Sequence, residues 1–197
     1  MEKVIARISF SFSILLRRLM QKIYDFDPWH VGPLMYKKYA QGIIEYCNND
    51  TKRDSIVEIG CGLGDIIRNV HFKCKKGYDT EMNVLKAAKI LAFLGKAGNI
   101  TFSTFSFPQD KLKGTYDAII LVNWIHHIQP DILKGNIEKY FFNNLYQEGT
   151  IIIDTVQDKD YKVNHDINFL TKDLPCKIIE IGTYERQRTV WAIKRVQ

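Results

Sequence analysis

Three glycines at alternate positions, Gly60, Gly62 and Gly64, form the motif of this chain that points most directly to chemistry. The apolar run over residues 56–59 before them predicts a buried parallel strand. Alternate glycines let the backbone turn sharply and leave no side chain in the way of a ligand. The pattern that follows predicts a helix over residues 65–70, whose N-terminus would point into the turn. A strand, a glycine turn and a helix indicate a site for a nucleotide-type ligand.

A carboxylate follows at the end of the next predicted strand, where Asp79 comes directly after residues 75–78. A carboxylate there can accept hydrogen bonds from both hydroxyls of a ribose. A dinucleotide fingerprint would place a third glycine at position 65, where this chain has Asp65. Asp79 could instead cap the helix predicted over residues 81–94. Together with the glycine turn, ribose binding is the interpretation we favour.

Strands and helices alternate along the chain, as in a doubly wound α/β fold. The predicted strands cover residues 55–59, 75–78, 99–102, 116–122, 149–154, 177–181 and 189–196. The predicted helices cover residues 1–22, 34–47, 65–70, 81–94, 132–145 and, in short form, 164–173. The last two strands read as an antiparallel hairpin. We expect two domains, an N-terminal helical cap or lid over residues 1–48 and a ligand-binding domain over residues 49–197.

The N-terminal segment is basic and amphipathic, since residues 1–22 hold five basic side chains against one acidic residue. As a helix, it places on one stripe Val4, Ile8, Phe12, Leu15, Leu19 and Ile23. The nine apolar or small residues over 8–16 are too few to span a bilayer, and no small-residue cleavage site follows them, so we expect no signal peptide. The favoured interpretation is a helix packed on the domain. The alternative is a basic amphipathic helix that touches a membrane surface or a partner.

Composition narrows the function classes further. A net charge of +6 permits an anionic partner without requiring one. Cys47, Cys61, Cys74 and Cys176 form no CxxC pair and no zinc-like spacing with the histidines, so we expect no metal site. Free thiols favour a reducing, cytoplasmic location, with peripheral membrane contact through residues 1–22 as the alternative. No basic groove interleaved with aromatic residues is evident, so we expect no nucleic-acid partner.

Taken in order, the motifs resemble those of the class I S-adenosylmethionine-dependent methyltransferases. The resemblance rests on residues 57–64, on Asp79, on residues 116–128 and on residues 148–153, and it covers roughly residues 40–197. It implies a Rossmann-like sheet of seven strands, the last of them antiparallel, and S-adenosylmethionine as the cofactor. Residues 49–197 would then be the methyltransferase domain.

The resemblance also implies where the cofactor lies. Its methionine part would pass close to Gly60, Cys61 and Gly62, with Glu58 near the ammonium group, and Asp79 would hold the ribose. Many members have an acidic residue after the third strand that meets the adenine, but this chain has Thr104 and Phe105 there, so adenine would be contacted by stacking or by a backbone carbonyl. The expected cofactor-binding residues are Glu58, Gly60, Cys61, Gly62, Gly64, Asp79, Thr80, Thr104, Phe105 and Asn123.

Histidines are the expected general bases, because methyl transfer to oxygen also requires removal of a proton. His126 and His127 follow the fourth strand at the edge where ligands of such sheets bind, and we place His126 ahead of His127. The pair could instead cap the strand-to-helix turn. His30, in an irregular loop beside Trp29, is a second candidate base or substrate contact, unless this loop is a packed elbow between two helices.

We therefore predict methylation of a small molecule, a sugar or a glycan precursor, with an oxygen as the expected acceptor atom and in-line displacement as the mechanism. The composition, rich in Lys, Ile and Asn, suggests an AT-rich bacterial genome, where short members of this family often modify sugars; this is analogy with the family. Two alternatives remain, a lipid or quinone methyltransferase at a membrane surface and a non-catalytic cofactor-binding protein.

Overall fold

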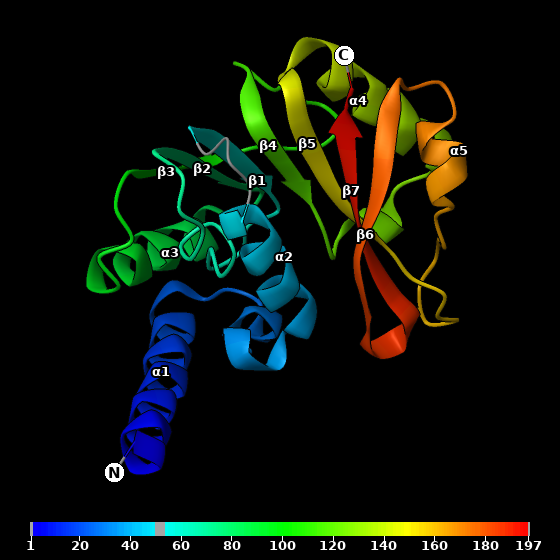
Figure 1. Cartoon of the computed structure of the whole chain (residues 1–197). Helices are drawn as coiled ribbons and strands as arrows, with labels where there is room; N and C mark the ends of the chain where they lie inside the picture. Colours follow the sequence, from blue (N-terminus) through cyan, green and yellow to red (C-terminus); the bar gives the residue numbers. More distant parts are fainter. Residues whose placement is uncertain (1, 50–53, 197) are drawn as a thin grey trace.

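One seven-stranded sheet organises the computed structural model, which describes residues 2–49 and 54–196, with side chains from residue 13 onward. The strands lie in the order β3-β2-β1-β4-β5-β7-β6 (Figure 1). Their bounds are β1 Ser55–Ile59, β2 Cys74–Asp79, β3 Ile100–Thr104, β4 Tyr116–Leu121, β5 Leu145–Thr155, β6 Cys176–Tyr184 and β7 Arg188–Arg195. Neighbours from β3 to β5 pair in parallel, whereas β7 is antiparallel to both β5 and β6. The predicted fold class and terminal hairpin are confirmed.

Helices cover both faces of the sheet (Figure 1). They are α1 Glu2–Tyr24, α2 Lys38–Asn49, α3 Met82–Leu94, α4 Pro130–Asn143 and α5 Ile167–Thr171. Adjacent strand residues alternate between two cores: Ile56 packs with α2 and α3, and Val57 packs with α4 and α5. Because both faces are covered, the central strands are nearly continuous apolar runs, as the sequence predicted.

The helix predicted over residues 65–70 is wrong, since this segment forms only hydrogen-bonded turns. A helix would pair the Ile67 N–H with the Leu63 carbonyl. Both groups are taken by side chains instead: the Glu58 carboxylate accepts from Ile67 N at 2.9 Å, and Arg68 Nε donates to Leu63 O at 3.1 Å. The glycine turn therefore leads into a side-chain-bonded loop.

The second helix begins later than predicted, at Lys38, because residues 34–36 form a separate 3-10 turn. A further 3-10 turn over Pro28–Val31 lies in the segment that was expected to be a loop. These short turns connect α1 to α2 and carry Trp29 and His30.

The apolar stripe of α1 does not pack on the domain, at least where the side chains of this helix are described, from residue 13 onward. Leu15, Leu19 and Ile23 are 66%, 49% and 58% exposed. Contact with the body is made by the opposite side, where Arg17 and Met20 are buried. Val4, Ile8 and Phe12 lie outside the described side chains. Figure 1 shows α1 projecting away from the sheet toward the N-terminus, and none of the described helices is long and apolar enough to cross a membrane.

Candidate functional site

The glycine loop closes over the carboxyl end of β2. The N–H groups of Gly60 and Cys61 both donate to the Tyr78 carbonyl, at 2.7 and 2.8 Å. Gly60 has a φ of 79°, and a Cβ built there would lie 2.2 Å from the Trp124 ring. Both the conformation and the close approach of Trp124 therefore require glycine at this position.

Asp79 ties this loop to the start of α3. Its buried carboxylate accepts from the Gly62 N–H at 2.8 Å through Oδ2, and from the Glu81 N–H at 3.1 Å through Oδ1. Each carboxylate oxygen has a second acceptor position, so the group can still receive hydrogen bonds from a ligand. The N-cap of α3 is Glu81 and not Asp79, but Asp79 holds the Glu81 backbone and can still bind a ligand.

Glu58 lies beneath the loop and is 4% exposed. Burial raises its pKa from 4.5 to about 8, although the hydrogen bond from the Ile67 N–H opposes the shift. A carboxyl group with such a pKa is mostly protonated at pH 7. It becomes an anion only when the pH rises or when a cation arrives beside it.

Asp65, next to the loop, is ionised, unlike Glu58. Its carboxylate meets Arg17 of α1 at 2.5 Å, Lys37 at 2.9 Å and Arg68 at 3.0 Å. Burial alone would raise the pKa of Asp65, but the hydrogen bonds and charges of Arg17 and Lys37 outweigh it and hold the pKa well below its usual range. Three cations thus surround one carboxylate, which leaves two positive charges uncompensated in this cluster.

A second buried carboxylate, Asp154 at the end of β5, organises the opposite side of the site. Its Oδ1 accepts from the Asn123 N–H at 2.8 Å, and its Oδ2 pairs with Arg188 and lies 3.1 Å from His126 Nε2. Asn123 has a left-handed φ of 76°, which asparagine tolerates better than most residues. Asp154 therefore fixes the turn after β4.

Arg188 extends this network to two tyrosines. Its guanidinium lies 4.9 Å from the centre of the Tyr39 ring and 5.9 Å from that of Tyr161, and its Nη2 donates to the Tyr161 hydroxyl at 2.9 Å. Burial raises the pKa of Tyr39 to about 12, although the nearby Arg188 charge opposes the shift. One arginine thus holds two aromatic rings from distant parts of the sequence.

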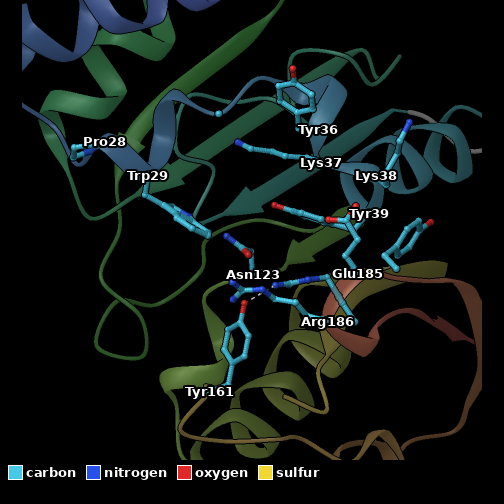
Figure 2. A pocket seen from close by; sticks show the side chains of 13 residues that line it. Pro28, Trp29, Tyr36, Lys37, Lys38, Tyr39, Asn123, Tyr161, Glu185 and Arg186 are labelled. Atoms are coloured by element: carbon cyan, nitrogen blue, oxygen red, sulfur yellow. Dashed lines mark hydrogen bonds between the residues drawn. The ribbon is translucent and has the colours of Figure 1, made fainter. Parts of the chain in front are cut away.

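Two cavities meet at this place. The larger, which we call the central cavity, measures about 620 Å³ and lies over the glycine loop and Asp79. The tyrosine cavity, beside it, measures about 450 Å³ and lies between the segment before α2 and the turn joining β6 to β7 (Figure 2). Both sizes suit small ligands. The residues that line both cavities are Trp29, Asn123, Tyr161 and Arg186.

The central cavity brings together much of the cofactor site expected from the sequence. The expected residues that line it are Gly60, Asp79, Thr80, Phe105 and Asn123. Glu58, Cys61 and Gly62 line a recess of about 60 Å³ that shares Gly60 and Asn123 with the central cavity. Gly64 instead faces the core, where a Cβ would lie 3.3 Å from the Phe102 ring, and Thr104 is exposed at the end of β3.

The three candidate histidines are placed differently. His127 and His30 line the central cavity. His126 has no exposed surface, and burial, helped by the Arg188 charge, lowers its pKa to about 4. The short 3-10 turn Ile125–His127 directs His126 toward the end of β5, so the structure does not agree with placing His126 ahead of His127 as a base.

Several residues in or beside the two cavities were not predicted from the sequence, among them Tyr39, Asp154, Tyr161, Arg186 and Arg188. Asp154 carried a usable signal, since it is a charged residue at the carboxyl end of an apolar strand, where ligands of parallel sheets bind. The tyrosines carried none, because α2 and the loop after β5 come together only in the fold.

The strand order, the glycine loop and the carboxylate beside it define a class I S-adenosylmethionine-dependent methyltransferase. Its cofactor is S-adenosylmethionine. The chain belongs to the family described as Nodulation protein S (NodS), whose model matches residues 14–163. No curated protein matches the chain by sequence.

Solved structures share this fold at low sequence identity. N-methyltransferase NodS from Bradyrhizobium japonicum WM9, in complex with S-adenosyl-L-homocysteine, has a TM-score of 0.71 at 13% identity, over 92% of this chain and 99% of that one. Magnesium protoporphyrin IX methyltransferase (ChlM) from Synechocystis PCC 6803, with bound S-adenosylmethionine, has a TM-score of 0.66 at 16% identity, over 99% and 97% of the two chains. At such identities, these likenesses show the fold alone.

Proposed function

We propose that the chain methylates a hydroxyl group of a small molecule, a sugar or a glycan precursor held in the tyrosine cavity, with the cofactor in the central cavity. The observation that carries this proposal is the junction at which the two ligand-sized cavities share Trp29, Asn123, Tyr161 and Arg186. Methyl transfer is an in-line displacement, so donor and acceptor must face each other across a short distance. Two adjoining cavities with shared lining residues could hold the donor and the acceptor side by side in this way.

The residues of the central cavity fit the cofactor. Asp79 offers carboxylate oxygens to the ribose, and Phe105, stacked on Tyr78 at 5.1 Å between ring centres, supports the adenine side. Glu58 and Gly62, in the recess that adjoins the central cavity, would lie toward the methionine end. Thr80 and Asn123 line the central cavity and keep their proposed cofactor contacts, whereas Gly64 shapes the loop from its core side and Thr104 lies outside the cavity lining.

The proposed chemistry needs one group that the cofactor supplies, a methyl on a sulfonium whose departure leaves a neutral thioether. The acceptor oxygen forms the new bond to carbon as the sulfur–carbon bond breaks, and the acceptor's proton passes to a base. His127 and His30 line the cavity and are the proposed bases. His126, buried against Asp154, would position the turn.

Residues 1–48 would act as a cap. Trp29 reaches both cavities, and His30 lies over the glycine loop, where a Cβ on Gly62 would come within 2.7 Å of its ring. The Arg17–Asp65 ion pair ties α1 to the same loop. The N-terminal segment is therefore positioned to close the site over bound ligands.

The test is product analysis. The full-length protein is incubated with S-adenosylmethionine and matched sugars that carry a hydroxyl or an amine at one position, and mass spectrometry locates any added methyl group. We expect a methyl ether. An N-methyl product would contradict the oxygen assignment, and the solved NodS relative is named an N-methyltransferase. Tight cofactor binding without any product would favour the non-catalytic alternative.

A second candidate, an enzyme that works at a membrane surface, is favoured by the face of α1. Leu15, Leu19 and Ile23 are exposed there, and Arg18 and Lys22 on the same helix are exposed as well. Such a helix suits an anionic lipid surface. Phosphatidylserine-containing vesicles should co-sediment the wild-type protein but not Leu15→Ser/Leu19→Ser. Ile132→Ser, which changes an exposed apolar residue of α4, is the matched control, and unchanged sedimentation of the double variant would contradict this candidate.

A further inference from the structure

We propose that the methyl acceptor is a ring compound that carries an anionic group, a phosphate or a carboxylate, bound in the tyrosine cavity through Lys38 and Arg186. This inference rests on the proposed function and narrows its substrate class.

Aromatic faces form much of the wall. Tyr39 and Tyr161 line the cavity and contact the Arg188 guanidinium, which holds their rings in fixed positions. Trp29, which is 64% exposed, borders it from the opposite side (Figure 2). Fixed aromatic faces bury and orient flat or puckered rings at little cost in conformational entropy. The shape therefore favours a ring over an extended chain.

The charge of the cavity is positive. Four basic residues line it, Lys37, Lys38, Arg186 and Arg188, against the single acid Glu185. Arg188 is neutralised by Asp154, and Lys37 shares Asp65 with two arginines, so part of its charge is uncompensated. Among the residues that the structure describes, Lys38 and Arg186 make no ion pair. Two exposed cations are thus available to an anion.

Arg186 is the better placed of the two. It stands in the turn between β6 and β7 with φ 60° and ψ 30°, a left-handed conformation that is unfavourable for a side chain of this size. The turn brings it to the boundary of both cavities, near Asn123 and Tyr161 (Figure 2). A guanidinium there can bind phosphate or carboxylate through two parallel hydrogen bonds. An anionic substituent bound by Arg186 would hold the ring close to the transferred methyl.

The experiment titrates matched probes into the full-length protein by calorimetry, with and without S-adenosylhomocysteine. Glucose is compared with glucose 1-phosphate and with glucuronate, and phenol with phenyl phosphate, so that the arms separate phosphate from carboxylate and sugar from aromatic ring. We expect at least one anionic probe to bind about 10-fold more tightly than its neutral partner at low salt, with the preference reduced at high salt. In Lys38→Gln/Arg186→Gln the preference should fall below about 2-fold, whereas Lys172→Gln, an exposed lysine next to α5, should keep it.

Equal binding of anionic and neutral probes, no binding of any probe, or a preference that survives in the double variant would overturn the inference. The binding of S-adenosylhomocysteine is measured in the same titrations and reports on the proposed function separately. A protein that binds the cofactor product but shows no anion preference refutes only the acceptor class. A protein that prefers anions but does not bind S-adenosylhomocysteine refutes only the cofactor site.

Discussion

The central cavity and the tyrosine cavity share part of their lining but have opposite charge. The central cavity has three acids, Asp79, Glu81 and Asp160, against the shared Arg186. The tyrosine cavity has four basic residues against Glu185. The difference matches the proposed division of ligands, because a sulfonium donor is stabilised by nearby carboxylates and an anionic acceptor by cations. Opposite charges on two sides of one boundary would place each ligand in its own cavity.

The boundary between the cavities depends on Asp154, so its removal should have the largest effect. Asp154→Ala leaves Arg188 buried without its counter-charge and the Asn123 N–H without its acceptor. Breaking a buried ion pair in this way typically costs about 3–5 kcal/mol, which urea unfolding should detect as a lower free energy of unfolding.

The matched control is Asp173→Ala, which removes an exposed carboxylate paired with Lys134 at 2.5 Å. Such solvent-screened surface pairs contribute little to stability, so this variant should unfold almost as the wild type does. Equal losses in the two variants would show that Asp154 does not support the boundary. A stable Asp154→Ala protein that keeps both ligand affinities would lead to the same conclusion.

The second prediction separates the cavities. Asp79→Ala removes the carboxylate proposed to bind the ribose and should weaken cofactor binding by about 10³-fold, since two charge-assisted hydrogen bonds are lost. Calorimetry with S-adenosylhomocysteine measures this loss. The affinity of the tyrosine cavity for its best probe should change little. Asp131→Ala, which changes an exposed acid in α4, is the control. A loss of cofactor affinity of similar size in this variant would show that Asp79 does not bind the ribose.

The sequence predicted what depends on local patterns. The strands, the glycine loop and the position of Asp79 follow from runs of residues adjacent in the chain, and the structure places them as expected. The segment after the loop was mispredicted, because Glu58 and Arg68 take the two backbone groups that a helix turn would pair. Hydrophobic periodicity contains no information about such side-chain competition.

The tyrosine cavity was beyond prediction for a related reason. Its walls come from residues 28–39, from Asn123, from Tyr161 and from residues 184–188, which no motif spacing links. In α1, the pattern identified an apolar stripe but not the side that meets the domain. That side is selected by the buried pairing of Arg17 with Asp65.

The third prediction compares the two adjacent histidines at the boundary. His127→Gln should lower kcat by about 10²-fold with little change in cofactor affinity, because His127 lines the central cavity as a proposed base. His126→Gln should instead lower stability, since its ring is buried against Asp154. Steady-state kinetics and urea unfolding distinguish the two effects. His71→Gln, at an exposed position, is the control, and equal losses of kcat at His126 and His127 would contradict the assignment.

The smallest predicted change in ligand affinity concerns pH and the charge of the central site. The folded-state pKa of Glu58 is about 8, against an ordinary 4.5, so the folded protein keeps a proton that the unfolded chain releases between these values. The free energy of unfolding should therefore fall as pH rises through this range. The contribution of Glu58 to cofactor affinity should change in the opposite direction, because the ionised carboxylate attracts the ammonium group proposed to lie beside it.

Between about pH 7 and pH 9, the range in which Glu58 ionises, the affinity of the wild-type protein for S-adenosylmethionine should rise about 10-fold relative to that of Glu58→Gln, because the ligand's own ammonium titrates equally for both proteins. Glu58→Gln keeps an acceptor for the Ile67 N–H but cannot ionise, so its affinity should follow only the titration of the ligand itself. The difference between the two proteins isolates Glu58. Parallel pH profiles would mean that this carboxyl group stays protonated with the cofactor bound, and the negative charge of the central cavity would then come from Asp79, Glu81 and Asp160.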